Sequence, residues 1–149
     1  MVKKVIVTAL AGASLIFNTG LFAQQCKVKP IVKAGMPRLA PYQYDSYALK
    51  EIVYGPKPKK ESINFEIFSD EDYKLVFCQT ELPQEVGITI YGKNKGKKEI
   101  LYFDESGKKS IQDFNFHPTQ SGTYYIEYDI PASTSTVKKG CFVVLIGLK

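Results

Sequence analysis

Eight short runs rich in Val, Ile, Tyr and Phe, with turn residues between them, constrain the fold of this chain more than any other feature. None of the runs has the 3.6-residue period of an amphipathic helix, and residues of these types favour strands. Gly and Asx residues between the runs supply turn chemistry. We therefore predict an all-β fold, an antiparallel eight-stranded jelly-roll-like β-sandwich. The runs cover residues 47–54, 62–68, 73–79, 86–92, 98–104, 110–116, 122–130 and 140–147.

Alternation along the runs predicts which side chains point inward, because successive side chains of a strand face opposite sides. Tyr73–Cys78 and Cys141–Ile146 are apolar at almost every position, which predicts strands in the middle of a sheet with both faces covered. The other runs alternate, and their predicted inward residues are Ile63, Phe65, Ile67, Val86, Ile88, Ile90, Tyr124, Ile126, Tyr128 and Ile130.

The first 23 residues have the order of a secretory signal peptide. Lys3 and Lys4 precede an uncharged, mostly apolar stretch, and Ala23 supplies a small residue before the expected cleavage site. A retained transmembrane anchor is the alternative, but the apolar stretch is well short of the roughly 20 residues that a spanning helix needs. We predict a periplasmic or secreted protein without a transmembrane anchor.

Lipid anchoring at Cys26 is a separate alternative. The preceding residues, Ala23-Gln24-Gln25, do not resemble the Leu-small-small pattern before an acylated cysteine. The sequence therefore argues against a lipoprotein.

Charge and composition exclude a dedicated nucleic-acid binder. Removing residues 1–23 takes away two lysines and no acid, which lowers the net charge from +5 to +3. Arg38 is the sole arginine, whereas bidentate recognition of phosphate favours arginine. The lysine clusters 57–60 and 93–98 either contact anionic polymers of the cell envelope or keep loops soluble.

The prolines Pro30, Pro37 and Pro41 predict an irregular leader over residues 24–46, before a single β-sandwich domain over residues 47–149. Tyrosines concentrate where the leader meets the first strand. Because Tyr combines an apolar ring with a polar tip, these residues suit a surface that binds protein or sugar. The alternative is a clasp that packs along the sandwich. The candidate binding residues are Tyr42, Tyr44, Tyr47 and Tyr54.

Three cysteines, Cys26, Cys78 and Cys141, remain after cleavage, and an oxidising compartment favours one disulfide and one free thiol. The third and eighth strands of a jelly roll are antiparallel neighbours. This places Cys78 beside Cys141, and we predict a disulfide between them. The alternative is that both are buried as small apolar residues.

No catalytic or metal site can be assembled from the sequence. His117 is the single histidine, with no serine-and-acid neighbourhood and no second ligand at zinc spacing. The acidic turns 70–72 and 104–107 do not match an EF-hand loop and are interpreted as solvated turns. We predict no enzyme activity, no metal and no cofactor.

Residues Phe114 to Ile126, which include His117-Pro118 and Gly122-Thr123-Tyr124-Tyr125, resemble a strand of bacterial pre-peptidase C-terminal domains and of GOLD domains, both β-sandwiches. The resemblance extends over about residues 61–147. Glu85-Val86-Gly87-Ile88 stands where those families carry paired acids, so no metal site is carried over. The resemblance implies a non-catalytic accessory or binding module.

These observations predict an exported, non-catalytic binding or accessory module of the bacterial cell envelope or secretome, with another protein as its partner. The alternatives are a carbohydrate-binding domain that uses exposed tyrosines and a hydrolase of unrecognised type.

Overall fold

The computed structural model describes residues 26–80, 82, 84–94, 97–103, 113–136 and 139–149. Within these ranges, all eight predicted strands are present, and the bounds of two of them match the prediction. A helix, α1 (Val28–Gly35), and a 3-10 helix, η1 (Met36–Leu39), precede the strands. The strands are β1 (Gln43–Val53), β2 (Lys59–Ile67), β3 (Tyr73–Gln79), β4 (Gly87–Asn94), β5 (Lys97–Phe103), β6 (Asp113–Phe116), β7 (Gly122–Ile130) and β8 (Lys139–Leu148).

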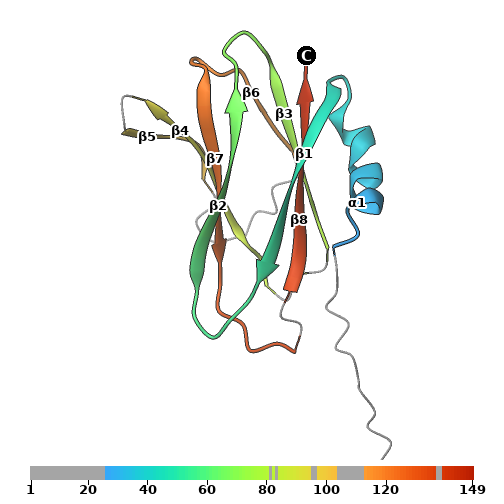
Figure 1. Ribbon diagram of the computed structural model, residues 1–149, viewed down its shortest axis with the longest axis vertical. Helices are drawn as coiled ribbons and strands as arrows, with labels where there is room; N and C mark the ends of the chain where they lie inside the picture. The colour runs from blue at the N-terminus through green and yellow to red at the C-terminus, as the bar shows by residue number, and fades with distance from the viewer. Residues whose placement is uncertain (1–25, 81, 83, 95–96, 104–112, 137–138) are drawn as a thin grey trace, which may run out of the picture.

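The strands form two four-stranded sheets in which every neighbouring pair is antiparallel. The first sheet has the order β1-β8-β3-β6 and the second has the order β2-β7-β4-β5. This is the arrangement of a double-sheet jelly roll. Figure 1 shows the two sheets as layers, with α1 on the outer side of the first sheet. The predicted fold class is confirmed.

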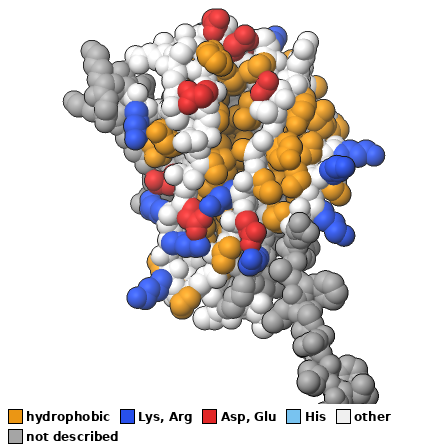
Figure 2. All heavy atoms as spheres, viewed as in Figure 1, with side chains coloured by type: hydrophobic (Ala, Val, Ile, Leu, Met, Phe, Trp, Pro, Cys, Tyr) orange, Lys and Arg blue, Asp and Glu red, His pale blue; other side chains and the backbone are white. Residues whose placement is uncertain are grey.

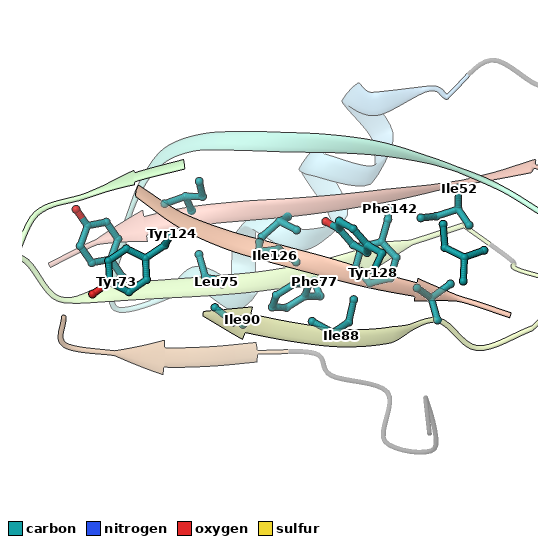
Figure 3. Packing of buried hydrophobic residues seen from close by; sticks show 14 of the residues in the cluster. Ile52, Tyr73, Leu75, Phe77, Ile88, Ile90, Tyr124, Ile126, Tyr128 and Phe142 are labelled. Atoms are coloured by element: carbon teal, nitrogen blue, oxygen red, sulfur yellow. The ribbon is translucent and has the colours of Figure 1, made fainter. Parts of the chain in front are cut away.

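The main core lies between the two sheets (Figure 3). The inward faces predicted from alternation are confirmed, because Ile63 and Phe65 are half-buried against the core and the other predicted residues are buried. Aromatic rings pack edge to face in its centre, where Phe142 contacts both Phe77 and Tyr128. The fully buried side chains of the core include Ile52, Ile67, Leu75, Ile88, Ile90, Ile126, Tyr128 and Ile130.

A second, smaller apolar layer lies on the outer face of the first sheet. Val76, Val143 and Leu145 of β3 and β8 pack there against Leu39 of η1, with Ile31, Val32 and Cys78 at the margin. The helices therefore cover the outer face of the two central strands. This confirms that strands apolar on both faces are covered on both sides, and it identifies what covers them.

The helix α1 corrects the prediction of an irregular leader over residues 24–46. Pro30 lies in the first turn of α1, where the backbone N–H has no intrahelical partner, so the missing donor costs little. Pro37 likewise lies at the start of η1. A proline at either place is compatible with a helix. The first strand accordingly begins at Gln43, four residues before the predicted start at Tyr47.

A disulfide joins Cys26, just before α1, to Cys141 of β8, with 5.7 Å between the Cα atoms. The predicted bond between Cys78 and Cys141 is therefore wrong, and Cys78 is a free, half-buried thiol. The β3–β8 register explains why. Cys78 lies opposite Val143. The neighbour of Cys141 on this side is Thr80, because the Cys141 N–H donates to Thr80 Oγ1 at 2.8 Å.

Arg38 connects η1 to β6, which is the strand at the opposite edge of the first sheet from β1. Its Nη2 lies 2.7 Å from Asp113 Oδ1 on β6, and its Nη1 donates to the Phe77 carbonyl oxygen at 3.2 Å. The β3–β6 pairing extends only to Val76, so β6 does not reach that carbonyl. The disulfide and Arg38 thus hold the two ends of the α1–η1 segment on the sheet. Neither helix of the described residues is long and apolar enough to cross a membrane.

Candidate interaction surface

The four candidate tyrosines are not all on the surface. Tyr44 and Tyr47 of β1 are 40% and 47% exposed. Tyr42 is half-buried and lies close to Gly147 of β8. Tyr54 is 4% exposed and belongs to the main core, which corrects its assignment as a surface binding residue.

The environment of Tyr54 explains its place in the core. Its hydroxyl donates to the Gln84 carbonyl oxygen at 2.6 Å, so the polar tip is satisfied although the ring is buried. Burial raises the pKa of Tyr54 to about 12. Tyr54 is therefore a structural residue at the start of the β1–β2 connection.

Two further apolar side chains accompany Tyr44 and Tyr47: Leu49 is 41% exposed and Met36 is 39% exposed. These four make up most of the large exposed hydrophobic side chains in the described part of the chain. We call Met36, Tyr44, Tyr47 and Leu49 the β1 surface. Figure 2 shows hydrophobic side chains gathered between β1 and α1 on this face of the molecule. Phe68, at 59% exposure, follows β2 and is not part of it.

The register places the β1 surface beside the covered outer face of the first sheet. Tyr47 lies opposite Leu145 and Leu49 lies opposite Val143 on β8. Since side chains opposite each other share a face, the β1 side chains continue the apolar layer that α1 and η1 cover over β8. The helices cover β8 and β3, so the apolar layer runs on into the exposed β1 surface.

A hollow of about 350 Å³ opens at the start of β1. Adjacent residues of a regular strand face opposite sides, yet Tyr44 and Asp45 both line this hollow. A bulge between Tyr44 and Ser46 breaks the alternation there. The side chains of the lining carry two carboxylates and one ammonium, and the lining consists of Gln43, Tyr44, Asp45, Glu71, Leu148 and Lys149.

Ion pairs neutralise the charges along the rest of β1. Lys50 contacts Glu61 of β2, and this pair joins the edges of the two sheets. Lys59 contacts the same carboxylate. Hydrogen bonds from the two lysines lower the pKa of Glu61. Glu51 pairs with Lys139 at 2.7 Å.

His117 and its surroundings offer no catalytic constellation within the described residues. Its Nδ1 lies 2.9 Å from Asp72 Oδ1, and both side chains are largely exposed. No group of three or more His, Cys, Asp or Glu residues that suits a metal ion occurs in the described ranges. The second predicted acidic turn, at 104–107, lies outside them.

The outer face of the second sheet holds an aromatic pair that the sequence did not single out. Tyr91 of β4 stacks on Tyr125 of β7 with ring centroids 5.0 Å apart, and Lys93 Nζ lies 4.9 Å from the Tyr125 centroid. Cross-strand pairing predicts such contacts only once the register is known. Each ring therefore has a neighbour within the sheet, and both tyrosines are half-buried.

No protein-family model matches this chain. No curated protein matches it either. Among solved structures, the chain is similar to Salmonella Typhimurium PliG, a periplasmic lysozyme inhibitor of g-type lysozyme, with 13% sequence identity and a TM-score of 0.40. The alignment covers 72% of this chain and 95% of that chain. At that score the likeness carries no argument about what this chain binds, and the resemblance to pre-peptidase C-terminal and GOLD domains stays a prediction.

Proposed function

We propose that this chain is an exported, non-catalytic binding module of the cell envelope or secretome that contacts another protein. The β1 surface carries the proposal. Tyr44, Tyr47, Leu49 and Met36 are each about two-fifths or more exposed, and Tyr47 and Leu49 share the outer face of β1. Figure 2 shows hydrophobic side chains gathered over this part of the molecule. Grouped apolar side chains on a folded surface cost solvation free energy unless a partner covers them, and they mark interaction sites.

The chemistry of the β1 surface suits a protein partner. Tyr and Met are enriched at protein interfaces, where a ring or thioether contributes apolar area with little polar desolvation. The surface also has a charged margin, because Asp45 lines the hollow beside Tyr44. An apolar centre with a polar rim is the usual anatomy of such interfaces.

The support beneath the surface is held in place before any partner binds. The Cys26–Cys141 disulfide fixes the chain before α1 to β8, and Arg38 fixes η1 to β6. A surface held in one arrangement loses less conformational entropy on binding. The disulfide also supports export, because such bonds persist in oxidising compartments.

The test is capture of a partner from the envelope fraction of the source cells, followed by measurement with that purified partner. We expect Tyr47→Lys with Leu49→Lys to weaken binding by about tenfold or more, because both changes place a charge in the apolar centre. Phe68→Lys is the matched control, since Phe68 is at least as exposed but lies elsewhere.

The same proteins separate the alternatives. Binding to a glycan array that is lost in Tyr44→Ala would support the carbohydrate-binding alternative. Turnover of a hydrolase substrate that is lost in His117→Ala would support an enzyme. If Tyr47→Lys with Leu49→Lys leaves the affinity for the partner unchanged, the β1 surface is not the binding site.

A further inference from the structure

The open edge of β1 presents backbone groups in addition to the β1 surface. β1 pairs with β8 along one side from Gln43 to Val53, and no strand of the described residues pairs with its other side. In an antiparallel strand alternate residues direct N–H and C=O groups to the same edge, so about five of its residues present unpaired groups there. Unpaired edge groups are a template for another strand.

The edges formed by β6 and β2 are less suited to pairing. β6, at the opposite edge of the first sheet, has only four residues. β2, at an edge of the second sheet, turns Ser62, Asn64 and Glu66 outward, where they are polar and exposed. Of these three edges, β1 alone combines length with exposed apolar side chains, at Tyr47 and Leu49.

The accessible stretch of the β1 edge is its first half. At Lys50 the ion pair with Glu61 of β2 joins this edge to the second sheet. Before the bulge that ends at Ser46, the pairing with β8 is out of register. Residues Ser46–Leu49 therefore form the regular, open segment, with the hollow directly before it.

The hollow specifies the chemistry at one end of the ligand. The side chains of Asp45 and Glu71 supply two carboxylates and that of Lys149 supplies one ammonium, and Tyr44 supplies an aromatic ring. A lysine or arginine side chain gains from both features, since carboxylates and ring faces attract cations. A basic side chain is therefore the complementary occupant.

A second copy of this chain is a poorer occupant. Two copies of β1 paired antiparallel around Ala48 would place Tyr47 opposite Leu49, which is favourable, but would also bring Asp45 of one copy to Glu51 of the other. Like charges placed opposite each other destabilise a strand pair. A helix would cover the apolar side chains but would leave the edge groups of β1 unpaired.

We propose that the β1 edge binds an extended segment of a partner protein as an added strand, whose backbone pairs with Ser46–Leu49. Apolar side chains of this segment pack against Tyr47 and Leu49, and a basic side chain of the segment enters the hollow. Backbone hydrogen bonds supply affinity in such complexes, and alternate side chains supply specificity. This inference rests on the proposed function and names the kind of partner that the β1 surface takes.

The experiment uses linear decapeptides selected from a random displayed library against the purified protein. We expect the selected peptides to alternate apolar residues and to carry Lys or Arg at one end. The backbone amide signals of Ser46–Leu49 should shift on binding. N-methylation of alternate peptide amides on one edge should weaken binding by about tenfold or more, whereas methylation on the other edge should not, because only one edge meets β1.

Protein variants test the two side-chain contacts. Tyr47→Lys with Leu49→Lys should weaken the peptide by about tenfold or more, and Phe68→Lys should leave it unchanged. Asp45→Asn with Glu71→Gln should weaken peptides ending in a basic residue by about fivefold at low salt, and less at high salt. The N-methylated peptides keep the test valid if a variant fails to fold.

Four outcomes would overturn the inference. The first is selected peptides that tolerate N-methylation on both edges, and the second is selection of no peptide that shifts the amides of Ser46–Leu49. The third is self-association of the protein that Leu49→Lys abolishes, which would make a second copy the occupant. A native partner whose binding is lost in Phe68→Lys but not in Leu49→Lys would leave the proposed function standing and this inference refuted.

Discussion

At the scale of single residues, two buried tyrosines have opposite hydrogen-bonding states. Tyr54 donates to the Gln84 carbonyl oxygen, whereas the hydroxyl of Tyr128, fully buried, has no hydrogen-bond partner in the described part of the chain. Burial raises the pKa of Tyr128 well above its ordinary value. A buried polar group without a partner reduces stability by its desolvation cost.

The two hydroxyls predict effects of opposite sign. Tyr128→Phe removes the unpartnered hydroxyl and should stabilise the protein by about 1–2 kcal/mol. Tyr54→Phe removes a satisfied hydroxyl, leaves the Gln84 carbonyl without its donor, and should destabilise by about 1–2 kcal/mol. Because the chain contains no tryptophan, denaturant unfolding is followed by circular dichroism. A destabilised Tyr128→Phe would show that its hydroxyl has a partner after all.

Glu61 links stability to pH. Hydrogen bonds from Lys50 and Lys59 lower its pKa in the folded state below the ordinary value of 4.5. A carboxyl with a depressed folded-state pKa stabilises the fold above its unfolded-state pKa, and this contribution is lost as the pH falls from 4.5 through the folded-state value.

Glu61→Gln should therefore lower the free energy of unfolding at pH 7 by up to about 1 kcal/mol, because the pair is partly exposed and screened. Below the folded-state pKa the variant and the parent should have similar stability. Unfolding curves at neutral and acidic pH check this, with the exposed Glu66→Gln as control. A difference that is the same at both pH values would show that Glu61 acts through packing and not through charge.

At the scale of elements, the close approach of α1 to the sheet depends on Gly35. A Cβ atom at this position would lie 2.6 Å from both Cys78 Sγ and Leu145 Cδ1. Alanine normally stabilises a helix relative to glycine. Gly35→Ala should nevertheless destabilise the protein by about 1–3 kcal/mol, because Cys78, Leu145 or the helix must shift within a packed layer.

Gly55→Ala is the matched control, because a Cβ there meets no atom within 4 Å. Thermal unfolding of the two variants distinguishes them. Equal effects on thermal stability would mean that Cys78 and Leu145 accommodate the added methyl group without loss of stability. The same contact explains why Cys78, which lies beneath Gly35, is half-buried.

The disulfide attaches the beginning of the same helical segment. Peptide mapping without reduction should find Cys26 linked to Cys141, with Cys78 as the alkylated free thiol. Cys26→Ser should destabilise by about 2–5 kcal/mol, because the bond restricts the unfolded chain over a separation of 115 residues. Cys78→Ser leaves the bond intact and serves as control. A linked Cys78–Cys141 peptide would reinstate the pairing predicted from sequence.

At the scale of the whole molecule, periodic strands could be predicted from the sequence and single contacts between distant elements could not. The sequence predicts the strands at 73–79 and 122–130 at their observed bounds, because their alternation and turns are local signals. The helix at Val28–Gly35 is short and contains Pro30, so the local sequence does not predict a helix there. The Cys26 pairing follows from where that helix packs.

For the candidate site too, residue types could be predicted from the sequence and exposure in the folded chain could not. Tyr44 and Tyr47 were identified by residue type and are exposed, but Tyr54 has the same residue type and is buried. Leu49 and Met36 were missed because an isolated apolar residue in a sequence is usually buried. The exposure of Leu49 depends on β1 being an edge strand that the helices leave uncovered, which is a property of the assembled sheet.

The last strand decides whether the first sheet exists at all. β8 pairs with β1 on one side and with β3 on the other, so the sheet has no continuous hydrogen bonding without it. β8 also supplies Val143 and Leu145 to the outer apolar layer and Phe142 to the main core.

A chain that ends before Lys139 should therefore show no cooperative unfolding transition. Removal of Lys149 alone, which costs one backbone hydrogen bond to Asp72, is the control and should leave the transition in place. A cooperative transition in the shorter chain would mean that the second sheet with its share of the core folds by itself, and that the β1 surface is assembled only when β8 docks between β1 and β3.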